Sequence, residues 1–426
     1  CVPVVVRWLT KGSRSQATWA AYFLFPGLFV YDSNLNLSAD HVLAFWVLPV
    51  LIVGRRMFPV AANATVNPRM CILFGIVLSG ALLTKYQVVY LVVMLLFLLF
   101  VTVAHQLISP GTTRRVALVF TMFTRLLTAG GVVLFLTSPH WLKNLLWHHN
   151  PVYPFARDLF HGTPWTSGIS FRLLDPGWTP EGSVSHRLIE TAWACLTFSF
   201  EPRDWPIFHR DWPVFGSLFS LLAVPAMILV PTRKLAALVL ATLLGVATWY
   251  WTYHQDRYLQ SLVPIMVVIT AVAILGLWRT QFKPLQALLV LIVAIQIIWS
   301  GDLPTIPTHA MSGRSSLGAT LDRASSGFRA AWAERDDPGT NLHKVGAELP
   351  RNAVPLLHEE HLRLGLGHWV VSDSFGRQGA IRYRNWETRR DAFDQLLGLG
   401  VTHVVTRSGP TGDFTLADNL VFFDLL

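Results

Sequence analysis

The chain has 426 residues, of which 52% are hydrophobic and only 14% are charged, with a formal net charge of +9. Because a soluble domain usually carries about a quarter charged residues, this composition argues against an ordinary soluble enzyme and predicts an integral membrane protein. The basic residues lie in pairs between apolar blocks and not in one cluster, which argues against a nucleic-acid-binding surface.

Apolar segments fill most of the first 300 residues and predict a mostly α, polytopic bundle of about nine membrane-spanning helices. In chain order these are Ala17–Tyr31, Asp40–Gly54, Arg69–Leu83, Tyr86–Ala104, Val116–Thr137, Pro213–Val230, Leu235–Tyr253, Leu259–Leu277 and Pro284–Trp299. Several tryptophans fall near the predicted ends, as in the aromatic belts of membrane proteins. Between two spans, Val184–Phe200 is typical of an amphipathic helix that lies along a membrane surface.

The distribution of charge predicts which side each loop faces. Alternate loops carry groups of basic residues and no acidic residue, whereas the opposite short loops carry only Lys85 and Arg257 as basic residues, so the positive-inside rule makes the first set cytoplasmic. These residues are Arg7, Lys11, Arg14, Arg55, Arg56, Arg69, Arg114, Arg115, Arg233, Lys234, Arg279 and Lys283. The opposite, extracytoplasmic face then receives Asp32–Ala39, the turn at Lys85, a long outer loop over 138–212 and the turn His254–Tyr258.

A composition shift near Gly301 divides the chain into a membrane domain, 1–300, and a soluble domain, 301–426, on the extracytoplasmic side. The second part is typical of a small α/β domain. Short strands are predicted at Val354–His358, Trp369–Ser372 and His403–Thr406, and a helix at Thr388–Leu399, which Gly400 ends.

Asp40 and Lys85 are the polar residues at predicted span ends that stand out as candidates. Asp40 opens an apolar helix, where it is either an acid favoured by the positive helix end or an acid facing the interior of the bundle. Lys85 lies between two long apolar helices on the side that the positive-inside rule leaves poor in cations. It either extends towards lipid headgroups or binds an anion.

Arg257 repeats the situation of Lys85, with a local ion pair to Asp256 as the alternative. Two isolated cations on one outer face suit a phosphate at the lipid–water boundary. Arg125 falls within a predicted span, and we interpret it as a residue at the inner boundary of that span.

In the outer loop His140, His148, His149 and His161 are candidate zinc ligands, but their spacing fits no standard zinc pattern. The prolines beside Tyr153 instead indicate a rigid turn. We find no nucleotide-binding glycine loop and no nucleophile elbow. No cofactor is therefore expected, and the spacing does not support a divalent cation.

Four ordered segments resemble the GT-C superfamily of integral membrane glycosyltransferases, which includes protein O-mannosyltransferases and aminoarabinose transferases. Each segment is weak alone, but their order and common side strengthen the resemblance, which covers roughly the first 300 residues. The segments are Phe25-Pro26-Gly27 through Asn36-Leu37-Ser38-Ala39-Asp40-His41, Ala81-Leu82-Leu83-Thr84-Lys85-Tyr86, Trp141-Leu142-Lys143-Asn144 with Asn150-Pro151-Val152-Tyr153-Pro154-Phe155, and Asp256-Arg257-Tyr258.

The resemblance implies hexosyl or pentosyl transfer from a polyprenyl-phosphate-linked sugar to an extracytoplasmic glycan, lipid or protein acceptor, in the bacterial inner membrane. It implies that Asp40 takes part in catalysis by orienting the acceptor or supporting the base. The residues expected to bind substrate or lipid phosphate are Lys85, Arg257, His41, Tyr258, Asn150 and Tyr153.

One departure from the family pattern leaves alternatives open. The family's main catalytic acid lies in a first outer loop, whereas this chain opens with what resembles the tail of the second helix, Val2–Trp8. Either the sequence begins inside a longer protein, or the protein is a non-catalytic membrane scaffold. A transporter or flippase of lipid-linked or small polar substrates is the other alternative, although no internal repeat supports it.

Overall fold

The computed structural model describes residues 1–18, 39–58, 67–108, 115–153, 155–160, 179–201, 218–229, 232–252, 254, 256–300, 338–358, 366–373, 381, 386–406, 422 and 424. These residues form two compact units. Unit 1 comprises Cys1–His140 and Leu173–Ser325, and unit 2 comprises Trp141–Arg172 and Ser326–Leu426.

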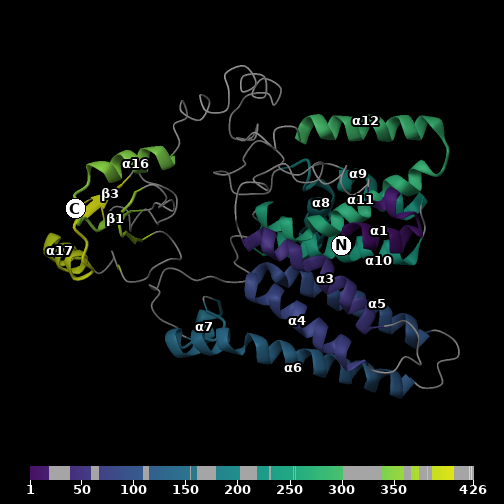
Figure 1. Ribbon diagram of the computed structural model, residues 1–426, viewed down its shortest axis with the longest axis horizontal. Coiled ribbons are helices and arrows are strands. Elements are labelled where there is room, and N and C mark those ends of the chain that lie inside the picture. Colours follow the sequence, from purple (N-terminus) through teal and green to yellow (C-terminus); the bar gives the residue numbers. More distant parts are fainter. Residues whose placement is uncertain are drawn as a thin grey trace. The chain divides into compact units, whose positions relative to one another are not determined.

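Every secondary-structure element described in unit 1 is a helix (Figure 1). Its elements are α1 (Val2–Thr10), α3 (Ala39–Met57), α4 (Pro68–Thr84), η2 (Tyr86–Val88), α5 (Val89–Ile108), most of α6 (Arg115–His148), α8 (Val184–Thr197), α9 (Leu218–Leu229), α10 (Arg233–Tyr250), η3 (Asp256–Leu262), α11 (Val263–Trp278) and α12 (Lys283–Ser300). Among them α11 is the most enclosed, since most of its residues are buried against its neighbours.

Four of the described helices are long and apolar enough to cross a membrane, as expected of an integral membrane protein. They are Tyr86–Ile108, Val119–His148, Arg233–Tyr250 and Tyr258–Trp278. Shorter apolar helices occupy Pro68–Thr84, Leu218–Ile228 and Lys283–Ala294. The total of about nine spans therefore stays a prediction, and most of the predicted span Ala17–Tyr31 lies outside the described residues.

The helix that contains the predicted fifth span extends beyond Thr137, because α6 continues without interruption to His148. The first residues of the predicted outer loop, from Ser138 on, are therefore helical. Pro139 has no N–H for the carbonyl of Phe135, but the Ser138 hydroxyl donates to that carbonyl at 2.8 Å. A serine side chain can replace a lost backbone hydrogen bond in this way, so the helix tolerates the proline.

Glycines bring α4 into close contact with two neighbouring helices (Figure 1). A Cβ atom added at Gly80 would lie 2.7 Å from the Trp46 ring of α3, and one at Gly75 would lie 2.7 Å from Val132 of α6. A larger residue at either position would push these helices apart. Small residues at helix contacts are a common means of packing in membranes.

The amphipathic helix predicted at Val184–Phe200 is present as α8, Val184–Thr197. Leu188, Ile189 and Trp193 are exposed, whereas Ala194 and Cys195 near the C-terminal end of the helix are buried. The helix packs on α10, and Trp251 Nε1, just past the end of α10, donates to Thr191 Oγ1 at 2.8 Å.

Unit 2 contains a small parallel sheet in which β1 (Pro355–Leu357) lies between β2 (Val371–Ser372) and β3 (His403–Val405). Its helices are α7 (Arg157–Phe160), α16 (Pro338–Glu348) and α17 (Arg389–Gly398). The strands and α17 lie within the predicted segments. Thr388 and Asp391 form a capping box that begins α17, as the threonine at that position suggests.

Candidate functional site

Asp40 and Lys85, two of the predicted site residues, form a direct ion pair in unit 1. Asp40 lies in the first turn of α3 and its side chain is only 3% exposed, and Lys85 follows the last residue of α4. Lys85 Nζ donates to Asp40 Oδ1 at 2.6 Å. Burial makes an isolated carboxylate costly, so the lysine offsets much of the penalty for placing Asp40 inside the bundle.

Tyr258 provides a second contact for the same ammonium group. Lys85 Nζ lies 4.2 Å from the centroid of the Tyr258 ring, and Tyr258 is buried within η3. A cation at this distance is attracted by the negative face of the aromatic ring. The start of α3, the turn after α4 and η3 therefore meet at one group, although the sequence separates them widely.

His41 and Gln260 join α3 and η3 beside this ion pair. Gln260 Nε2 lies 2.5 Å from His41 Nδ1, and Gln260 is buried. Thr252, which follows α10, donates to the hydroxyl of Tyr90 on α5 at 3.3 Å. These contacts hold the surroundings of Lys85 in a fixed arrangement.

The geometry leaves Lys85 able to reach a further partner. An ammonium group has three donors, and the Asp40 carboxylate and the Tyr258 ring are two of the contacts that this group makes. The Lys85 side chain is 22% exposed, so one side of it faces outward. Such a group can bind an anion while Asp40 holds it in place.

The remaining predicted site residues are not brought to this pair by any described contact. Arg257 belongs to η3, but its side chain lies outside the described residues. Asn150 and Tyr153 belong to unit 2, where Asn150 Nδ2 donates to the Phe155 carbonyl at 2.6 Å and Tyr153 stacks on His148. This is the turn that the prolines predicted, and a role in substrate binding stays a prediction.

Within the part of the chain that the structure describes, no group of three or more His, Cys, Asp or Glu residues could hold a metal ion. His140 lies 3.4 Å from the Tyr86 hydroxyl, His148 stacks on Tyr153, and His161 lies outside the described residues.

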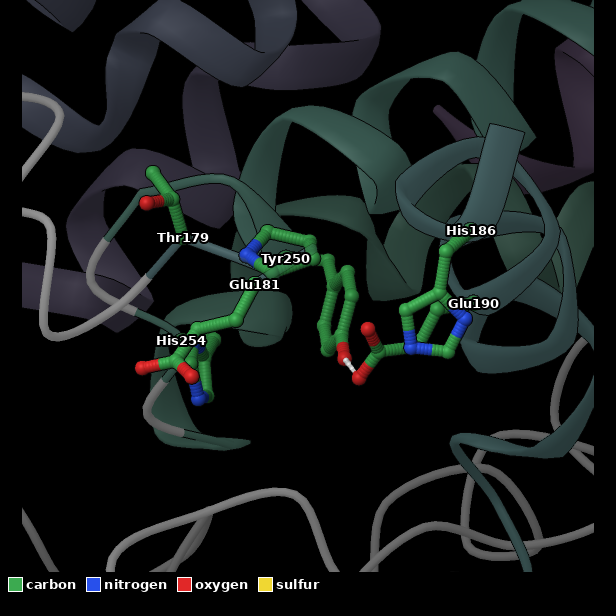
Figure 2. Close-up of a pocket in the computed structure, with 7 residues that line it drawn as sticks. Thr179, Glu181, His186, Glu190, Tyr250 and His254 are labelled. Atoms are coloured by element: carbon green, nitrogen blue, oxygen red, sulfur yellow. Dashed lines mark hydrogen bonds between the residues drawn. The ribbon is translucent and has the colours of Figure 1, made fainter. Parts of the chain in front are cut away.

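A pocket of about 400 Å³ in unit 1 was not predicted from the sequence (Figure 2). Its lining comes from the segment before α8, from α8 itself and from the end of α10: Thr179, Pro180, Glu181, His186, Glu190, Tyr250 and His254. The Tyr250 hydroxyl donates to Glu190 Oε1 at 2.7 Å. The one sequence feature that indicates this pocket is the position of Glu190 on a predicted amphipathic helix. That feature does not predict which residue the Glu190 carboxylate contacts.

Comparison with protein-family models, with curated proteins and with solved structures finds no match for this chain.

Proposed function

We propose that this protein is a membrane glycosyltransferase that moves a sugar from a polyprenyl-phosphate donor to an acceptor on the extracytoplasmic side of the bacterial inner membrane. The observation that carries the proposal is the placement of Lys85 between the buried Asp40 carboxylate and the Tyr258 ring. Three segments that resemble a family of such enzymes supply these three residues.

The reaction requires stabilisation of a leaving phosphate. The acceptor hydroxyl attacks the anomeric carbon, a new glycosidic bond forms, and the bond from that carbon to the phosphate oxygen breaks. The lipid phosphate departs with its electron pair and gains negative charge. A fixed ammonium group in a partly dehydrated site stabilises that developing charge more than water does.

Asp40 and Tyr258 position the Lys85 ammonium for this task. Asp40 is engaged with Lys85 in the described state, so its part is to hold the cation and to orient the acceptor nearby. The base that takes the acceptor proton is not assigned among the described residues. The apolar helices around the pair offer surfaces for the isoprenoid chain of the donor.

The test measures sugar transfer from radiolabelled polyprenyl-phosphate sugars in membranes that contain the protein expressed from its gene. We expect Lys85→Ala to lower the rate about 100-fold or more, as does the loss of other groups that stabilise developing charge. Lys85→Arg should retain part of the activity because the positive charge stays. Arg257→Ala tests the second predicted phosphate ligand in the same assay.

Lys234→Ala is the matched control, since Lys234 also lies over an aromatic ring, that of Trp8, but contributes to no predicted site. Its transfer rate should equal that of the unmodified protein. Full transfer by well-folded Lys85→Ala, or no transfer by the unmodified protein with any donor, contradicts the proposal.

A further inference from the structure

The pocket beside α8 is lined by carboxylates, whereas the site at Lys85 presents a positive charge. Apart from Pro180, every residue that lines it carries a polar group, and two of them, Glu181 and Glu190, carry carboxylates. Among the described residues no lysine or arginine lines it. Arg187 is close in sequence, but its Nε donates to the carbonyl of Gly182. The described lining of the pocket therefore offers two carboxylates and no ammonium or guanidinium group.

Glu190 is held in a defined orientation. Tyr250 binds Oε1, and Trp251 fixes the neighbouring Thr191, so α8 cannot rotate away from α10 without breaking both contacts. Figure 2 shows the Tyr250 ring between Glu190 and His186 on one side and Glu181 and His254 on the other. A carboxylate that is already oriented loses little conformational entropy when a ligand binds.

The aromatic rings at the end of α10 add to the attraction. The rings of Tyr250 and His254, which both line the pocket, have centroids 5.5 Å apart. Electron-rich ring faces favour cations, and flat rings also suit the carbon face of a sugar. The volume of about 400 Å³ lies within the usual range of small-molecule sites.

We propose that this pocket binds the ammonium group of a small polar amine, with Glu190 as its anionic partner and Glu181 adding negative charge on the other side of the Tyr250 ring. The proposal goes beyond sugar transfer and does not depend on it, because it concerns binding to residues that the Lys85 site does not use. An amino sugar and an aliphatic amine share this chemistry, and the test separates them.

The experiment measures binding by calorimetry to the purified protein in nanodiscs of neutral lipid. The probes are D-glucosamine, D-glucose, D-glucose 6-phosphate and putrescine. We expect glucosamine to bind about tenfold or more tightly than glucose, because an ammonium–carboxylate hydrogen bond is stronger than a neutral one. The phosphate should bind most weakly. Comparable affinity for putrescine assigns the site to amines in general, and a preference for glucosamine assigns it to amino sugars.

Glu190→Gln should weaken glucosamine binding about tenfold and leave glucose binding unchanged, because it removes charge at constant shape. Glu181→Gln is a second variant in an exposed position, in case the first does not fold. Glu201→Gln is the matched control: that carboxylate also accepts from an aromatic donor, Trp193, at 3.2 Å, but does not line the pocket.

Equal affinity for glucosamine and glucose, no binding of any amine, or unchanged glucosamine affinity in both pocket variants overturns the proposal. Lys85→Ala should bind glucosamine normally even where transfer is lost. Failure of the binding proposal is thus distinct from failure of the proposed function.

Discussion

The two ends of the helices in unit 1 manage charge in different ways. At the polar end, which we define by Asp40, Lys85 and Tyr258, a buried carboxylate and an ammonium group are 2.6 Å apart. At the basic end, which we define by Trp8, Arg55 and Lys234, two cations share one indole ring. The Arg55 guanidinium carbon lies 3.8 Å and Lys234 Nζ 4.9 Å from its centroid.

The difference shows that the charges at the polar end are balanced by a counter-ion within the protein, whereas those at the basic end depend on ions or lipids around the protein. The polar end contains its own counter-ion, so burial can be tolerated there. The sequence segments at the basic end contain no Asp or Glu, and like charges repel unless salt or anionic lipid headgroups screen them. Arg279, which donates to the Thr10 carbonyl at 3.3 Å, adds another positive charge near α1.

The largest expected effect is a difference between full labelling and no labelling, in a test of whether the two ends face opposite sides of the membrane. In a Cys1→Ser background, Glu181→Cys should react with a membrane-impermeant maleimide in intact cells, and Gln281→Cys only after permeabilisation. Both positions are exposed. Reaction of both in intact cells would refute the predicted topology.

The other two cysteines provide a low background for that test. Cys71 and Cys195 are buried. Burial also raises the pKa of the Cys195 thiol to about 11, so the reactive thiolate is scarce near pH 8. The cysteine-depleted parent protein should therefore remain unlabelled on both sides.

A smaller effect is expected from breaking the ion pair at the polar end. Lys85→Ala should lower the free energy of unfolding by about 2–3 kcal/mol, because it removes the cation that lies 2.6 Å from a buried carboxylate, although the partial exposure of Lys85 reduces the cost. Thermal unfolding in detergent measures the loss. Adding Asp40→Asn to Lys85→Ala should restore part of the stability, and additive losses would show that the two residues are not coupled.

The smallest effect is expected at the basic end. Lys234→Ala removes a cation–π contact but also relieves repulsion with Arg55, so the free energy of unfolding should change by less than about 0.5 kcal/mol. High salt should reduce this change further and leave the Lys85→Ala loss nearly unaffected, since buried charges are screened less. If salt altered the stability changes of Lys234→Ala and Lys85→Ala equally, the proposed difference between the two ends would be wrong.

The sequence predicted the positions of most described helices because apolar runs, basic flanks and caps are local signals. Asp40 and Lys85 could be selected in the same way, as polar residues at span ends. Their direct pairing could not be predicted, because residues 45 positions apart meet only through the packing of α3 on α4. The sequence alone predicts a separate partner for each residue, an acceptor for Asp40 and a phosphate for Lys85.

The missed features depend on contacts that have no local signal. Glu190 accepts a hydrogen bond from Tyr250, which lies 60 positions away in the sequence. The pocket that these two residues line therefore cannot be predicted from either segment alone. The continuation of α6 depends on the Ser138 hydroxyl, and a Ser-Pro pair in sequence is more often the start of a turn.

The length of α6 has a consequence for the surrounding bilayer. At 1.5 Å per residue its 34 residues span roughly 50 Å, well beyond a hydrocarbon layer of about 30 Å. Exposed Leu142, Leu146 and Trp147 near its C-terminus are poorly suited to water, so the helix must incline steeply or end among the headgroups. Bilayer thickness would then set the inclination of α6. Because the helix has no break, a change in membrane thickness would change the inclination over its whole length.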